Sequence, residues 1–201
     1  MLRLDAVPEP VVELLGQLGC HKALEQFALG GGTSLALRFG HRLSVDLDYF
    51  TTSEFQPQEL FETLGLEAAT ILSVSKNTLS LDAGGVKMDL LRHAYAEIAP
   101  VDRIGGHRLV ALPDLTAMKL NAIANRGSKK DFYDVVELLQ HYSLTAMLGF
   151  FSKKYPNTDP FAVVRSLAWF EEADQEPDPI PMLGQTWESV KRIITGAVGE
   201  L

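Results

Sequence analysis

Hydrophobic positions in the first half of the chain follow two periods, one typical of helices and one typical of strands. Apolar residues spaced three and four apart predict short helices at 11–18, 23–28, 33–39 and 58–64. Alternation of apolar and polar residues predicts strands at 44–50, 69–75, 78–82 and 86–92. A turn signal at 82–85 joins the last two strands, so we expect a meander of antiparallel strands there.

From residue 113 onward the pattern is almost entirely helical. The spacing predicts helices at 114–125, 129–141, 144–154, 161–170 and 186–198, with prolines as breaks between several of them. The acidic, proline-containing segment 171–181 is typical of an extended connector. We therefore expect an α+β fold, in which residues 1–112 form a mixed or antiparallel sheet with flanking helices and residues 113–201 form a helical C-terminal part.

Composition and charge narrow the class of protein. Hydrophobic residues make up 46% of the chain and charged residues 22%, which is typical of a globular protein. The net charge of -8 opposes general attraction to nucleic acid or to an anionic membrane. No apolar run approaches the roughly 20 residues that span a bilayer, so we expect no membrane partner. The lone Cys20 excludes an intramolecular disulfide and fits the reducing cytoplasm, and we expect it to be a small buried residue.

Two carboxylates on one predicted strand suggest a metal site. Asp46 and Asp48 stand two residues apart and would share one face of the strand at 44–50. Asp89 would lie on a strand able to run beside it and is the natural third ligand. Carboxylate oxygens of this kind select Mg²⁺ or Mn²⁺. The plainer alternative is that each of these aspartates lies on a solvated strand face.

A glycine run precedes these carboxylates. Gly30, Gly31 and Gly32 allow close approach of the backbone to phosphates, and the start of the following helix supplies free N–H groups. Thr33 and Ser34 would add hydroxyl donors. A flexible turn is the simpler interpretation of the glycines alone. Because a loop, a helix and a strand with paired carboxylates follow in the order needed for nucleotide transfer to a hydroxyl, we favour a nucleoside triphosphate site.

The predicted helix at 114–125 carries one interior charge, Lys119, which needs an anionic partner or must extend along its neighbours to water. A triphosphate is one candidate partner, and Arg126 lies two turns farther along the same face. Lys130 and Asp134 stand four apart and fit a surface ion pair equally well.

Two further interpretations concern polar residues around these positions. The stretch 128–131 has the spacing of a capping box, which would explain Ser128 and Asp131. A basic rim would reconcile an acidic protein with an RNA acceptor, and its candidate members are Arg38, His41, Arg42, Arg126, Lys129 and Lys130.

These residues resemble the motifs of a known family. Leu29-Gly30-Gly31-Gly32-Thr33-Ser34, then Arg38, Gly40, Arg42, Ser44 and Asp46-Leu47-Asp48, resemble the first motif of the AbiEii/AbiGii toxin family of nucleotidyltransferases. The stretch 114–119 resembles the lysine motif of that family, and 126–134 resembles its Lys-Asp-x-x-Asp motif. The resemblance covers roughly residues 30–139.

The resemblance implies a DNA-polymerase-β-like nucleotidyltransferase core whose helical part completes the active site. It implies catalytic roles for Asp46, Asp48, Lys119 and Asp134, and nucleotide contacts for Arg42, Ser44, Arg126 and Lys130. It further implies a toxin that acts on tRNA and is controlled by a cognate antitoxin. Transfer to a protein or small molecule, and a non-catalytic nucleotide-binding module that acts through a partner, remain open alternatives.

Overall fold

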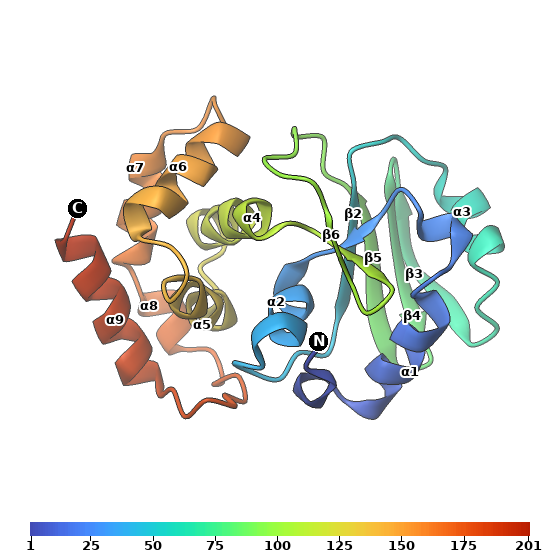
Figure 1. Ribbon diagram of the computed structural model, residues 1–201, viewed down its shortest axis with the longest axis horizontal. Coiled ribbons are helices and arrows are strands. Elements are labelled where there is room, and N and C mark those ends of the chain that lie inside the picture. Colours follow the sequence, from blue (N-terminus) through green and yellow to red (C-terminus); the bar gives the residue numbers. More distant parts are fainter. The chain divides into compact units, whose positions relative to one another are not determined.

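A mixed seven-stranded sheet forms the core of the first unit of the computed structural model, which describes residues 1–201 (Figure 1). The strands follow the order β3-β4-β5-β2-β1-β7-β6. β2 pairs in parallel with β5 and β1 with β7, while the other neighbours are antiparallel. The strand bounds are β1 Ala28–Leu29, β2 Leu47–Thr51, β3 Ala69–Ser75, β4 Thr78–Ala83, β5 Val86–Arg92, β6 Asp102–Ile104 and β7 His107–Leu109.

One face of this sheet carries the hydrophobic core of the first unit. Leu47 and Tyr49 of β2 are buried there with residues of α1 (Glu9–Leu18) and α3 (Pro57–Leu64). Because side chains alternate along a strand, Asp48 projects from the other face. The remaining helical elements of this unit are η1 (Leu4–Ala6), η2 (Lys22–Leu24) and α2 (Gly31–Phe39).

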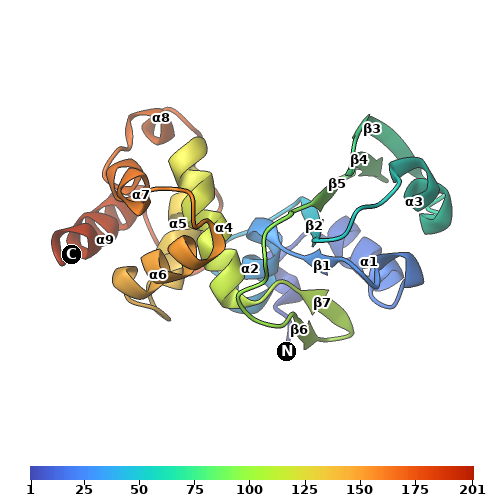
Figure 2. The ribbon, with the colours of Figure 1, turned by 90° about the horizontal axis from the view of Figure 1, so that it is seen from above.

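The second unit is helical. Figure 2 shows its helices grouped around α4, which contacts α5, α6 and α7. The buried Trp187 of α9 packs against the rings of Phe132, Tyr133 and Phe170. No helix in the structure combines the length and apolar character needed to cross a bilayer. The helix bounds are α4 Leu112–Asn125, α5 Lys129–Leu138, α6 Leu144–Lys154, α7 Pro160–Leu167, α8 Glu171–Asp174 and α9 Trp187–Gly199.

The two units interleave along the chain. The first comprises Met1–Arg38, Ser44–Ala96 and Pro100–Val110, and the second comprises the remaining residues. The short segment Phe39–Leu43 therefore belongs to the helical unit. Backbone bonds tie it there, since Leu43 N donates to Ile180 O and Met182 N donates to His41 O, each at 2.9 Å.

The predicted α+β fold is confirmed, with three local corrections. The strand predicted at 44–50 begins only at Leu47, and the backbone N–H of Ser44 donates to the carbonyl oxygen of Ala6, which is not part of the sheet. The helix predicted at 23–28 is wrong, since these residues form part of η2 and then β1. The expected connector at 171–181 contains the short helix α8.

Candidate active site

Gly31 and the side chain of Asp48 lie in direct contact where α2 begins. Gly31 has a φ of +62°, and a Cβ at this position would lie 2.0 Å from Asp48 Oδ2. At Gly30 a Cβ would lie 2.6 Å from Cδ2 of Phe50. The Gly30 N–H donates to the Asp48 carbonyl oxygen at 2.7 Å. Glycine alone fits both positions, so the glycine run holds its backbone against a carboxylate of β2.

Asp89 lies beside Asp48 on the neighbouring strand. The parallel register of β2 and β5 pairs these two residues, so both project from the same face of the sheet. Lys87 Nζ donates to Asp89 Oδ2 at 2.8 Å. The hydrogen bond with Asp89 raises the pKa of Lys87, and the charges of Asp89, Asp46 and Asp48 raise it further. Asp89 binds this ammonium group directly, whereas Asp46 and Asp48 act on it only through their charge.

The chemistry of these side chains fits a hard divalent ion, because carboxylate oxygens are the ligands that Mg²⁺ and Mn²⁺ prefer. Their positions do not form a cluster of three or more metal-ligating side chains. Asp89 instead accepts hydrogen bonds from the Ser80 hydroxyl and the Lys87 ammonium group. The contribution of Asp89 to a metal site therefore stays a prediction.

Hydroxyl groups around the glycine run support the loop itself. Thr33 Oγ1 donates to the carbonyl oxygen of Asp46 and lies 2.8 Å from Ser44 Oγ. Ser34 is fully buried, and its hydroxyl has no hydrogen-bond partner. Thr33 and Ser44 thus fix the chain that leads into β2 and place Asp46. The nucleotide contacts expected of Gly32, Thr33, Ser34 and Ser44 stay predictions.

A second group of charged residues is buried in the helical unit. Asp134 accepts hydrogen bonds from Arg42 Nε at 2.7 Å and Nη2 at 2.9 Å, and His41 Nε2 lies 2.7 Å from it. Lys119 Nζ lies 2.6 Å from Asp134 and 2.9 Å from Asp131. Burial raises the pKa of Asp134, but the charges of Arg42 and Lys119 outweigh this effect and hold it well below its usual range. Asp134 therefore stays ionised and joins three cationic or imidazole side chains.

This network identifies the partners of Lys119. Its side chain is buried between Asp131 and Asp134, so the alternative in which it extends to water is wrong. Arg126 also donates to Asp131, from Nε at 2.8 Å and from Nη2 at 3.0 Å, while its side chain is 57% exposed. Arg126 is therefore both anchored and accessible.

Two other sequence interpretations are corrected here. Asp134 bonds to the buried network and does not pair with Lys130, which is exposed. Ser128 and Asp131 do not form a capping box, because their side chains bond to Glu176 and to the cations of the network.

The predicted basic rim is also wrong. His41, Arg42 and Lys129 are buried, and Arg38 pairs with Asp102 at 2.9 Å. Four of its six members are therefore used inside the protein. The partnership of His41 with Asp134 was not predicted, because 93 residues separate the two and no local spacing signals it.

Comparisons with known proteins agree with this fold. Residues 13–82 match the family model described as nucleotidyl transferase AbiEii toxin, type IV TA system. The protein aq_aa25 of Aquifex aeolicus (strain VF5) is 35% identical over 184 residues, which are 87% of this chain and 87% of that protein.

Two solved structures are similar in fold at low sequence identity. MenT4, the nucleotidyltransferase toxin Rv2826c from Mycobacterium tuberculosis H37Rv, has a TM-score of 0.61 at 15% identity and covers 95% of this chain and 84% of its own. JHP933 from Helicobacter pylori has a TM-score of 0.56 at 18% identity and covers 97% and 94%. These structures show the same fold. The matched family model and the Aquifex relative lead to one conclusion: the chain belongs to the AbiEii family of nucleotidyltransferase toxins of type IV toxin–antitoxin systems.

Proposed function

We propose that this protein transfers a nucleoside monophosphate from a nucleoside triphosphate to an acceptor hydroxyl on tRNA. The observation that carries the proposal is the contact between the Gly31 backbone and the Asp48 carboxylate, with Asp89 next to Asp48 on β5. A nucleotide brings its phosphates and its metal ion together. A loop that binds phosphate must therefore lie next to the carboxylates that bind the metal. Gly31 and Asp48 lie next to each other in this way.

In the proposed reaction the acceptor oxygen forms a bond to the α-phosphorus, and the bond from that phosphorus to pyrophosphate breaks. Asp46 and Asp48, joined by Asp89, would hold Mg²⁺ or Mn²⁺. When bound, such an ion lowers the pKa of the attacking hydroxyl and neutralises charge on the departing phosphates. The backbone N–H groups of Gly31 and Gly32, at the start of α2, would bind phosphate oxygens.

The cations for which the sequence predicts nucleotide contacts belong to the helical unit. Arg126 is accessible, and a phosphate group bound to it would compete with Asp131 for the guanidinium group. Asp131 would keep Lys119 as its second partner in that case. Lys130 is exposed. We assign Arg42, Lys119 and Asp134 a positioning role, since their charges are satisfied among themselves.

The choice of tRNA and the existence of an antitoxin rest on the family resemblance and on the description of the matched family as a toxin of type IV systems. Two alternatives share the same site chemistry: transfer to a protein or small molecule, and a nucleotide-binding module without catalysis. The identity of the labelled product separates all three.

The test is incubation of the purified protein with total RNA or with lysate protein and each α-labelled nucleoside triphosphate in the presence of Mg²⁺. We expect label in the tRNA fraction and its loss in Asp46→Asn and Asp48→Asn. The matched control is Asp5→Asn, which removes an exposed carboxylate of the same unit and should leave labelling unchanged.

Each result that contradicts the proposal points to a different part of it. Full labelling by Asp46→Asn would overturn the proposed metal site. If the label appears in protein, the acceptor is a protein and not tRNA. If the protein binds nucleotide in the presence of magnesium but forms no labelled product, the non-catalytic binding module is favoured. Circular dichroism of each variant shows whether a loss of labelling reflects a loss of fold.

A further inference from the structure

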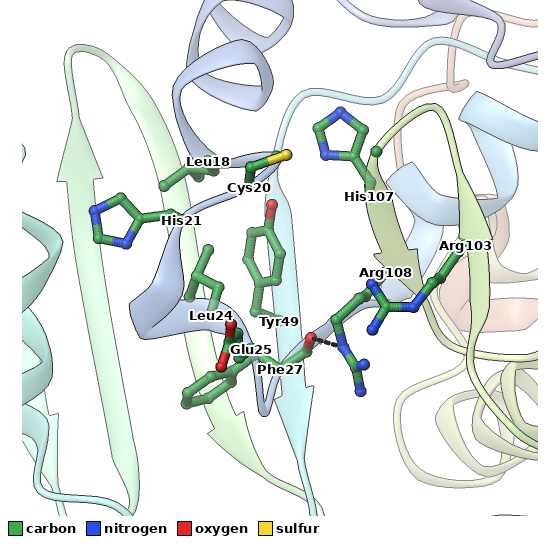
Figure 3. A pocket seen from close by; sticks show the side chains of 12 residues that line it. Leu18, Cys20, His21, Leu24, Glu25, Phe27, Tyr49, Arg103, His107 and Arg108 are labelled. Carbon is green, nitrogen blue, oxygen red and sulfur yellow. Dashed lines mark hydrogen bonds between the residues drawn. The ribbon is translucent and has the colours of Figure 1, made fainter.

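A pocket lies in the sheet unit, on the face of the sheet that carries Tyr49. Its volume is about 510 Å³, which lies within the roughly 300–1,000 Å³ range of small-molecule sites. Figure 3 shows Tyr49 in the middle of the wall, with apolar residues on one side and the β6–β7 hairpin on the other. Since Asp48 projects from the opposite face of the sheet, this pocket is separate from the proposed nucleotide site.

The Tyr49 hydroxyl points into this pocket without a hydrogen-bond partner. The residue is 5% exposed, and Figure 3 shows its oxygen directed toward Cys20 at the end of α1. Burial raises the pKa of Tyr49, so the hydroxyl stays protonated at neutral pH and is available as a donor. Cys20 is exposed, contrary to the prediction that it is buried. A hydroxyl donor that points into a pocket and has no protein partner is available to an acceptor atom of a ligand.

Two arginines face each other across the hairpin beside that hydroxyl. Arg103 and Arg108 are register partners of β6 and β7, and like charges placed opposite each other destabilise a sheet. Arg108 Nε donates to the carbonyl oxygen of Phe27 at 3.1 Å, which fixes its position. Neither arginine forms an ion pair with a protein carboxylate. Arg103 is exposed and Arg108 is half-buried, so both guanidinium groups are accessible to an anion that enters the pocket.

The other polar groups of the wall leave this positive charge in place. Glu25 also lines the pocket and is exposed, so two arginines and one carboxylate give a net charge of about +1. Burial lowers the pKa of His107, and its imidazole is therefore neutral at neutral pH. His21 Nδ1 accepts a hydrogen bond from Ala23 N. Leu18, Leu24 and Phe27 supply an apolar surface.

We propose that this pocket binds a small organic anion that consists of an apolar ring with a phosphate or carboxylate group. The charged group would bind Arg103 and Arg108, whose planar guanidinium groups match both kinds of anion. The ring would pack against Leu24 and Phe27. An acceptor atom on the ring would accept a hydrogen bond from the Tyr49 hydroxyl.

The test is calorimetric titration of the whole protein with four probes: phenyl phosphate, phenylacetate, inorganic phosphate and benzyl alcohol. We expect saturable one-to-one binding of a ring-bearing anion and at least tenfold weaker binding of inorganic phosphate and of the neutral alcohol. The first two probes distinguish a phosphate ligand from a carboxylate ligand.

Variants locate the binding. Combined Arg103→Gln and Arg108→Gln should weaken binding of the preferred probe at least tenfold, and Tyr49→Phe should weaken binding of a probe with a ring hydroxyl, 4-hydroxyphenyl phosphate, by about fivefold. Arg192→Gln removes an exposed arginine of α9 and should change nothing. Asp48→Asn, which disables the proposed nucleotide site, should bind the probe as the natural chain does.

Equal binding by the double arginine variant and by the natural chain would overturn the proposal, as would the absence of saturable binding by both ring-bearing anions. Loss of binding in Asp48→Asn would place the probe in the nucleotide site and equally refute a separate pocket. Urea denaturation of each variant confirms that the fold is retained.

Discussion

Replacing Gly31 by alanine should destabilise the protein through two separate costs. A residue with a side chain loses about 1–2 kcal/mol in the left-handed conformation that Gly31 adopts. The new methyl group would also lie 2.0 Å from Asp48 Oδ2, and an extra carbon forced into a filled site costs about 1–3 kcal/mol. We therefore expect Gly31→Ala to lower the free energy of unfolding by about 2–5 kcal/mol.

Urea denaturation measures this loss, and Gly65→Ala is the matched control. Gly65 has a φ of +58°, but a Cβ there would meet nothing within 4 Å, so only the backbone cost of about 1–2 kcal/mol applies. In an Asp48→Ala background, Gly31→Ala should lose most of its additional cost, because the obstructing carboxyl group is gone. If Gly31→Ala costs no more than Gly65→Ala, the proposed contact between the loop and the carboxylate is refuted.

Three further predictions concern a buried aspartate, a buried hydroxyl and a paired lysine. Asp134→Asn should cost about 3–5 kcal/mol in urea denaturation, since it leaves Arg42 and Lys119 without their shared charge. The pKa of Asp134 is lowered in the folded state, so the ionised carboxylate stabilises the fold above about pH 4, and this stabilisation is lost as the pH falls below that value. Asp134→Asn should therefore make the free energy of unfolding depend less on pH in the acid range. Ser34→Ala should keep or raise the melting temperature, because it removes an unpaired buried hydroxyl; a clear drop would show that this hydroxyl is paired. Lys87→Gln should tighten Mn²⁺ binding measured by calorimetry, because the ammonium group competes for the same carboxylates; unchanged or weaker binding would count against a metal at that point.

The fold was predictable where a period extends over enough residues. β3, β4 and β5 have six or seven residues each, and their alternation was sufficient to predict them and their antiparallel order. β1, β6 and β7 have only two or three residues, too few to show a period, and none of them was predicted. The helix expected at 23–28 failed for the same reason, because its apolar spacing covers less than two turns.

The contacts of the candidate site were also predicted only in part. Strand alternation predicted the face from which Asp48 and Asp89 each project. It does not determine which strands are neighbours, and the parallel pairing of β2 with β5 that brings the two residues together is seen only in the structure. Local spacing suggested partners for Asp134 and Asp131, and both suggestions failed. Arg42 lies 92 residues from its partner Asp134, so only tertiary packing brings these two together. Asp131 binds Lys119, 12 residues away, and Arg126, five residues away, and neither spacing is that of a capping box.

The interleaving of the two units has a consequence for dissecting this protein. A fragment that ended at Val110 would retain His41 and Arg42 but not Asp134, the carboxylate that both of them bind. It would carry the Arg42 cation without its counterion and without the helices that bury it, on the short stretch of chain that connects α2 to β2. Deletion of the helical half would therefore disturb the connection between the glycine loop and the aspartates, and the sheet half is not a self-contained catalytic module.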